Sequence, residues 1–209
     1  MPHARVVPLL FRPLSALCLA AMLLGSAVRP AAAHPHVFVT DSVTFVFDTS
    51  GRVTALRLDW LFDDFFSFQL FEDFDADDDG RFDDAEVAEL HDGAFVSLRD
   101  YGWFTHLYLD GVDQEAPEPT AFQAIAEGEY VRYRFELKLA TSVDPKATRL
   151  EVAIYDQEYY VEVLLDAAAP VAFDGAPPSC RYTIAEDSAH AYYFDMVYPQ
   201  MIRLDCGTS

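Results

Sequence analysis

Hydrophobic and polar residues alternate along most of the chain after Val37, and a period of two predicts β-strands. The segment EYVRYRFELKLA (129–140) shows this pattern most clearly. One face of that strand would carry Val131, Tyr133, Phe135, Leu137 and Leu139, and the other Arg132, Arg134, Glu136 and Lys138. An antiparallel sheet with one solvated face produces such an alternation, so we expect this segment to be a half-buried strand.

Other segments repeat the same pattern at shorter length. VTFVFD and RVTALRLDW are separated by TSG, which predicts a hairpin that turns near Ser50 and Gly51. Further strands are predicted for WFTHLYLDG, TAFQAIAE, RLEVAIYD and YYVEVLL, and FDGAPPS (173–179) is predicted to be a loop. No internal repeat or low-complexity linker indicates a second domain.

One region follows a helical period instead. Phe66, Leu70 and Phe74 recur at a spacing of four before an acidic stretch. After that stretch, helical spacing relates Val87, Leu90, His91, Ala94, Phe95 and Leu98. We therefore expect a mainly β (α+β) fold, an antiparallel β-sandwich-like domain with a helix–loop–helix inserted at 63–100.

The acidic stretch DADDDGRFDDAE (75–86) matches the twelve-residue calcium loop of EF-hand proteins, with Gly80 at the sharp turn. The predicted ligands are Asp75, Asp77, Asp79, the backbone carbonyl of Arg81, Asp83 and Glu86. The alternative is a solvated acidic loop that matches by chance. Regulatory loops usually come in pairs, whereas this chain has one, so calcium is expected to brace the fold rather than to signal.

The N-terminus has the features of a secretory signal. Arg5 and Arg12 precede the apolar run LSALCLAAMLLGSAV, and AAA (31–33) provides an Ala-x-Ala cleavage site. We therefore predict a cleaved segment 1–33 and one periplasmic domain, 34–209. The alternative is an uncleaved anchor, although the apolar run is short for a membrane span of about 20 residues.

Charge and cysteines refine this picture. The chain has a net charge of −21; removal of 1–33 takes away three arginines and no acidic residue, which leaves −24. Such a surface repels nucleic acid and attracts cations, although acidity also serves solubility alone. Cys180 and Cys206 would remain as an even pair in an oxidising compartment, so we predict a disulfide between them.

Cleavage after Ala33 would place HPHVFV at the new N-terminus, with His34 first. His34 and His36 would lie on one side of an extended segment beside the free α-amine, and these nitrogens suit copper, nickel, cobalt or zinc. Pro35 has no amide hydrogen, which excludes a square-planar site built on deprotonated amides. Asp156 is a candidate oxygen ligand. The alternative is that the two histidines merely begin a strand.

The positions of the other histidines in the sequence indicate structural roles. His91 and His106 are expected to pack in the core, and His190 is expected at the surface. The sequence has no serine or cysteine nucleophile motif, no phosphate loop and no dinucleotide fingerprint. We therefore expect no enzyme.

HPHVFV after a signal, TFVFDTSGRV, the calcium loop, LRDYGWFTHL and YDQEYYV together resemble a bacterial exported family of unknown function. Its members are described as a periplasmic component of an uncharacterised ABC-type transport system and are often encoded beside nickel/cobalt-type permeases. The motif positions are His34 to His36, the calcium loop, Tyr155, Asp156 and Tyr159. Many relatives have Asp-Pro-Thr-Tyr where this chain has Asp-Gln-Glu-Tyr, which leaves the geometry of this turn open.

These observations favour a periplasmic metal-handling accessory of a divalent transition-metal transport system, with metal ions and an inner-membrane permease as partners. Two alternatives stay open. One is a copper-dependent oxidative enzyme that uses the N-terminal histidine. The other is a calcium-stabilised interaction module that binds no transition metal.

Overall fold

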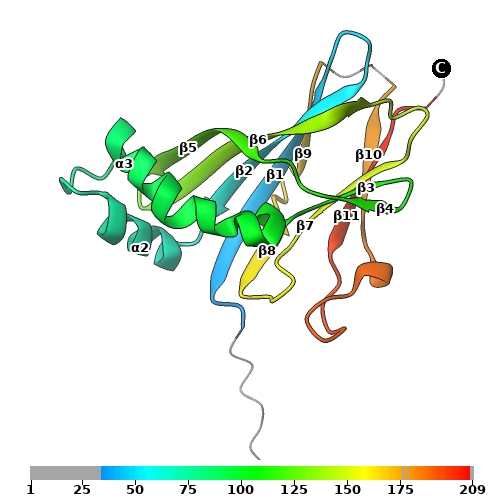
Figure 1. Cartoon of the computed structure of the whole chain (residues 1–209). Helices are drawn as coiled ribbons and strands as arrows, with labels where there is room; N and C mark the ends of the chain where they lie inside the picture. Colours follow the sequence, from blue (N-terminus) through cyan, green and yellow to red (C-terminus); the bar gives the residue numbers. More distant parts are fainter. Residues whose placement is uncertain (1–33, 176, 178, 208–209) are drawn as a thin grey trace, which may run out of the picture. The chain divides into compact units, whose positions relative to one another are not determined.

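The computed structural model describes residues 34–175, 177 and 179–207, which form two facing β-sheets with helices at one end (Figure 1). Sheet A has the strand order β5 (Pro119–Glu127), β6 (Tyr130–Val143), β2 (Val53–Phe62), β1 (Val37–Phe47) and β8 (Val161–Leu165), and β9 (Val171–Asp174) also pairs with β1. Sheet B has the order β10 (Arg181–Glu186), β11 (Gln200–Asp205), β7 (Leu150–Ile154), β3 (Thr105–Leu109) and β4 (Val112–Gln114). The mainly β, two-sheet prediction is confirmed.

The predicted hairpin joins β1 to β2. Asp48 organises its turn, since the Asp48 carboxylate accepts hydrogen bonds from the backbone of Ser50 and Arg52. Gly51 completes it at φ +79°, in the left-handed region that favours glycine. The loop predicted at 173–179 begins later than expected, because Phe173 and Asp174 still belong to β9.

Sheet A is mixed rather than purely antiparallel. β1 pairs antiparallel with β2, but it pairs parallel with β8 at its beginning and with β9 toward its end. Alternation along a strand reports which face is buried and carries no information about the direction of its neighbour. The parallel contacts place the start of β1 beside the start of β8, where the predicted histidine site lies.

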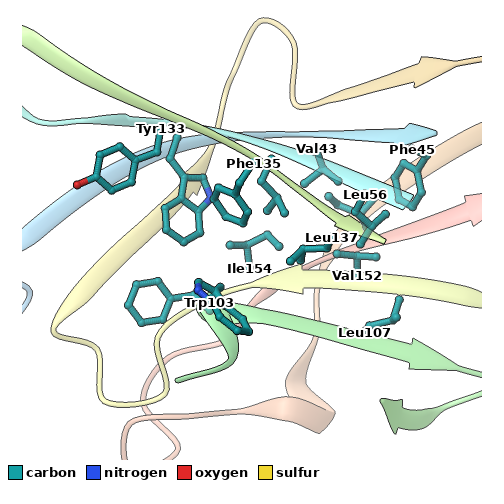
Figure 2. Packing of buried hydrophobic residues seen from close by; sticks show 14 of the residues in the cluster. Val43, Phe45, Leu56, Trp103, Leu107, Tyr133, Phe135, Leu137, Val152 and Ile154 are labelled. Atoms are coloured by element: carbon teal, nitrogen blue, oxygen red, sulfur yellow. The ribbon is translucent and has the colours of Figure 1, made fainter. Parts of the chain in front are cut away.

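The core fills the space between the two sheets (Figure 2). Val131, Tyr133, Phe135 and Leu137 of β6 are at most 2% exposed, as the alternation predicts. The opposite face of β6 is solvated, and there Arg132 and Arg134 both form ion pairs with Asp59 of β2. On the solvated face of β6, these arginines are therefore paired with an acidic residue of the neighbouring strand.

Sheet B ends in the predicted disulfide. Cys180 precedes β10 and Cys206 follows β11, and the bond between them closes the end of this antiparallel pair. The 26-residue separation encloses both strands and the connection 187–199. No helix among the described residues is long and apolar enough to cross a membrane.

The helical insertion lies between β2 and β3. It consists of α2 (Asp64–Phe74), α3 (Asp84–Leu90), the π-helical segment η1 (His91–Phe95) and the 3₁₀ segment η2 (Val96–Phe104). Phe95 is 1% exposed and stacks on Phe122 of β5 at 4.2 Å between ring centroids. His91 is half-buried against both of these rings. Aromatic packing thus holds the insertion on sheet A.

Asp41 of β1 lies on the core face, opposite Trp60 of β2, and is fully buried. Within the described part of the chain, neither of its carboxylate oxygens has a hydrogen-bond partner. Burial, with a smaller contribution from the nearby charge of Asp59, raises the pKa of Asp41 well above the usual aspartate range. The stability that this group contributes is therefore present in acid and is lost as pH rises through its folded-state pKa.

Asp41→Asn is expected to stabilise the protein at about pH 8 by about 1–3 kcal/mol, because the carboxylate is ionised in the unfolded chain and, on folding, must either take up a proton or bury an unpaired charge, whereas asparagine does neither. The gain should shrink as pH falls toward the usual aspartate pKa of about 4. Urea unfolding at several pH values measures it. The exposed Asp100→Asn is the control and should change stability by less than about 0.5 kcal/mol at every pH. A pH-independent effect of Asp41→Asn would contradict the assignment.

Candidate metal sites

The acidic loop wraps around Asp75, which follows the last residue of α2. The Asp75 carboxylate accepts hydrogen bonds from the backbone N–H groups of Asp79 at 3.1 Å and Gly80 at 2.9 Å. Gly80 turns the chain at φ +76°. The first half of the loop is thus curled so that its carboxylates converge.

Glu86 closes the loop from the other side. Its side chain belongs to α3 and is buried; one oxygen accepts from the N–H of Ala76 and the other from that of Asp83, both at 2.8 Å. Asp83 in turn caps α3 by accepting from the N–H groups of Ala85 and Glu86. The hydrogen bond from Ala76 to Glu86 joins the two ends of the loop, and the reciprocal capping box between Asp83 and Glu86 fixes the start of α3.

Three of the predicted calcium ligands come together. Asp75, Asp77 and Glu86 each offer a carboxylate oxygen, and these oxygens lie within 4.8 Å of one another; within 34–175, 177 and 179–207 this is the one such group of three. The charge of Asp79, followed by partial desolvation, raises the pKa of Asp77. Arg81 is exposed, and the Asp83 carboxylate faces the helix backbone. These carboxylate oxygens suit a hard divalent cation such as calcium, which prefers oxygen ligands.

Asp77→Asn is expected to abolish calcium-dependent stabilisation while leaving the calcium-free protein as stable as before, or slightly more stable. The substitution removes one ligand and also one of the mutually repelling carboxylates. With a dissociation constant of about 10⁻⁴ M, about 1 mM calcium should stabilise the native chain by about 1.4 kcal/mol. Thermal unfolding with calcium and with a chelator measures the difference.

Glu89→Gln provides the matched control, since Glu89 is exposed on α3 and outside the loop. It removes the same charge and should keep the full calcium response. A calcium response that survives Asp77→Asn unchanged would show that the ion binds elsewhere.

The two predicted histidines meet at the start of β1. The rings of His34 and His36 lie edge to face with centroids 5.1 Å apart. Tyr160 packs beside both rings, at 4.8 Å from His36 and 6.0 Å from His34, and Tyr193 lies 5.6 Å from His34. The backbone N–H of His36 donates to the carbonyl of Tyr160 at 2.8 Å, so the pairing of β1 with the segment leading into β8 positions the pair.

The Nδ1 atom of His34 is shielded from solvent and has no hydrogen-bond partner among the described residues. Buried polar atoms are nearly always paired, so an unpartnered imidazole nitrogen indicates a missing partner. Imidazole nitrogens bind borderline-soft divalent cations well. His36, by contrast, is exposed, and its ring centroid lies 5.1 Å from that of His34.

The structure does not bring the third predicted ligand to this pair. The buried Asp156 carboxylate accepts from the backbone N–H groups of Glu158, Tyr160 and Val161, at 2.9–3.1 Å. Among the residues that the structure covers, Asp156 and the two histidines form no group with converging donor atoms. Asp156 instead builds the Asp-Gln-Glu-Tyr turn, which places Tyr160 against the histidines.

Sequence reasoning missed the aromatic residues around the histidine pair. Tyr193 belongs to the connection 187–199, where Tyr193, Phe194 and Asp195 all have φ between 48° and 61°. The tyrosine-rich segment AHAYYF was visible in the sequence, but no local pattern links it to His34. In the same connection Tyr192 packs on Tyr155 at 4.5 Å, and Tyr155 stacks on His106 at 3.8 Å. The half-buried His190 of this connection lies against Asp187.

Comparisons with known proteins agree in indicating a family without an assigned activity. A family model described as "Protein of unknown function (DUF1007)" matches residues 18–200. An "Uncharacterized 15.5 kDa protein in trpE 3'region" of Spirochaeta aurantia is 37% identical over 131 residues, covering 61% of this chain and 91% of that protein. An uncharacterized protein of Haemophilus influenzae is 22% identical over 156 residues, covering 74% of this chain and 73% of that protein.

Among solved structures, Biomphalaria glabrata acetylcholine-binding protein type 1 is 12% identical to this chain. The match covers 91% of this chain and 96% of that one, with a TM-score of 0.37. A score this low does not establish a shared fold and says nothing about a ligand.

Proposed function

This chain belongs to the DUF1007 family, whose function is unknown, and we propose that it is an exported metal-handling protein. In this proposal His34 and His36 bind one divalent transition-metal ion, nickel, cobalt, zinc or copper, and the loop 75–86 holds calcium as a brace. The observation that carries the proposal is the buried Nδ1 of His34, which has no partner among the described residues and lies beside a second imidazole.

The donor set supports a borderline-soft cation. Two imidazoles are available, and the α-amine of His34 would be a third nitrogen if the segment 1–33 is removed. Pro35 excludes the square-planar amide mode. Two or three nitrogen donors leave coordination positions open on an ion that takes four or more ligands. Open positions suit a protein that accepts and releases an ion.

Calcium has a separate role in this proposal. Its ligands come from the ends of α2 and α3, so a bound ion ties the helical insertion together. The strongly negative net charge of −21 raises the local concentration of cations around both sites. Delivery of the transition metal to an inner-membrane permease is the part of the proposal that is supported by the family resemblance alone.

Calorimetric titration of the purified protein with nickel, cobalt, copper and zinc tests the proposal, with the mature N-terminus determined by mass spectrometry. We expect one equivalent of at least one metal to bind with a dissociation constant below about 100 μM. His34→Ala combined with His36→Ala should weaken this binding at least about a hundredfold, because both proposed ligands are lost.

His91→Ala is the control, since His91 lies on η1, away from the histidine pair, and should leave the affinity unchanged. No binding below about 100 μM, or binding that survives the double substitution, would overturn the proposal. Stabilisation by calcium alone would then favour an interaction module. A copper(II) resonance with turnover of a reductant would favour the oxidative enzyme.

A further inference from the structure

A cavity of about 430 Å³ lies between the helical insertion and the segment that leads into β8. Ala94 and Leu98 of the insertion and Val161 of β8 provide aliphatic walls, and the buried residues Trp60 and Phe104 line it from the core. This volume is within the range of pockets that bind small organic molecules, about 300–1,000 Å³. The cavity is separate from the predicted calcium site, since no residue of the acidic loop lines it.

The accessible part of the lining is largely aromatic. Tyr101 of η2 and Tyr160, which precedes β8, line the cavity and are 48% and 50% exposed, so an occupant can reach them without displacing the core. Phe66 of α2 is partly exposed on the same lining. The face of an aromatic ring carries negative electrostatic potential and attracts a cation that lies within about 6 Å of the ring centre. These rings therefore favour a positively charged group over a neutral one.

The charged residues of the lining have the same preference. They are Asp156 and Glu158, and none of the lining residues that the structure describes is Lys, Arg or His. The buried Asp156 carboxylate accepts three backbone N–H groups, so it adds negative potential but is already paired. Glu158 is exposed, and Arg99 of the neighbouring η2 segment forms its ion pair with Glu118 instead. Glu158 is therefore the carboxylate that is available to a cationic occupant.

Desolvation sets the orientation of such an occupant. Full burial of an ammonium group would cost more than a single ion pair returns. Tyr101, Tyr160 and Glu158 are all exposed to solvent, so an ammonium group among them keeps part of its hydration. An apolar body attached to it gains by burial against Ala94 and Leu98. A neutral molecule would gain only this apolar burial, and an anion would be repelled.

We propose that this cavity binds a small organic cation, an ammonium group carried on an apolar ring or chain. The ammonium group lies beside Glu158 and the rings of Tyr101 and Tyr160, and the apolar body lies against Ala94 and Leu98. The inference does not depend on metal binding at the histidine pair.

Three probes that share a phenyl ring and differ in charge test this inference: benzylammonium, benzyl alcohol and benzoate. Dissociation constants for the purified chain are measured by ligand-observed NMR at about pH 7, where the amine is protonated. Calcium is present and transition metals are omitted, so that neither metal site takes up the amine. We expect benzylammonium to bind about 3- to 30-fold more tightly than benzyl alcohol, the combined effect of cation–π contacts and one exposed ion pair. Benzoate should bind most weakly.

Two substitutions at exposed positions separate these contributions. Glu158→Gln should lower the ratio of the benzylammonium and benzyl alcohol affinities about 2- to 5-fold, because it removes the ion pair. Tyr101→Leu should also lower this ratio about 2- to 5-fold, because it keeps an apolar side chain but removes an aromatic face. The matched control is Glu186→Gln, which removes the same charge from an exposed position on β10 outside the cavity and should preserve the ratio.

The proposal is overturned if benzylammonium does not bind with a dissociation constant below about 10 mM, or if benzyl alcohol or benzoate binds as tightly. A ratio that survives either Glu158→Gln or Tyr101→Leu would also overturn it. So would a ratio that falls equally with Glu158→Gln and Glu186→Gln, because the preference would then come from the net charge of −21 and not from the cavity.

Discussion

Phe95→Ala is expected to lower the free energy of unfolding by about 3–5 kcal/mol, the usual cost of removing a large ring from a packed core. Phe95 is 1% exposed, and its ring centroid lies 4.2 Å from that of Phe122 and 5.0 Å from that of Phe135. It therefore joins the helical insertion to β5 and β6. The surrounding aromatic rings would fill the resulting cavity only in part. Urea unfolding followed by circular dichroism measures the loss.

The same helical insertion provides the controls. Phe65 and Phe68 of α2 are 65% and 59% exposed, so Phe65→Ala and Phe68→Ala delete the same ring from a solvated face. Each should change stability by less than about 0.5 kcal/mol. If Phe95→Ala costs no more than these controls, Phe95 does not anchor the insertion to sheet A.

Cys180→Ser combined with Cys206→Ser is expected to destabilise the protein by about 3 kcal/mol and to lower its melting temperature by about 6–12 °C. The disulfide restricts the unfolded chain across a separation of 26 residues. The native β10–β11 pair retains its backbone hydrogen bonds, so the expected loss comes mainly from the freer unfolded state. Differential scanning calorimetry measures both quantities.

A reductant provides the internal control for this prediction. It should lower the melting temperature of the native chain to that of the double variant and should leave the double variant unchanged. A double variant that melts with the native chain would mean that the cross-link adds no stability to the C-terminal strands.

The strands that the sequence predicts well are those whose alternation is set by burial on one side only. Residues 129–140 have apolar and charged side chains in strict order, and β6 buries and exposes them accordingly. β10 was not foreseen, because its residues are mostly exposed and carry little alternation. The parallel pairing of β1 with β8 was also missed, since strand direction depends on how distant segments connect and not on local pattern.

The sequence predicts the acidic loop more completely than the histidine pair, again because local pattern does not report contacts between distant segments. Every predicted calcium ligand lies within twelve consecutive residues, so the spacing alone brings Asp75, Asp77 and Glu86 together. The surroundings of the histidine pair are assembled from three distant segments, since Tyr160 and Tyr193 follow His34 by more than a hundred residues. Spacing predicts the two histidines, but only the folded sheet supplies the tyrosines.

The direction of β1 has a practical consequence for handling the molecule. β1 begins beside the histidine pair, whereas the last residues of β11 lie at the opposite end of the sheets, near the C-terminus (Figure 1). A purification tag, fluorophore or surface linker attached after Gly207 would therefore leave the two imidazoles accessible. A polyhistidine tag placed directly before His34 would crowd the two imidazoles and would itself bind added transition metal, so titrations of such a preparation would report the chemistry of the tag.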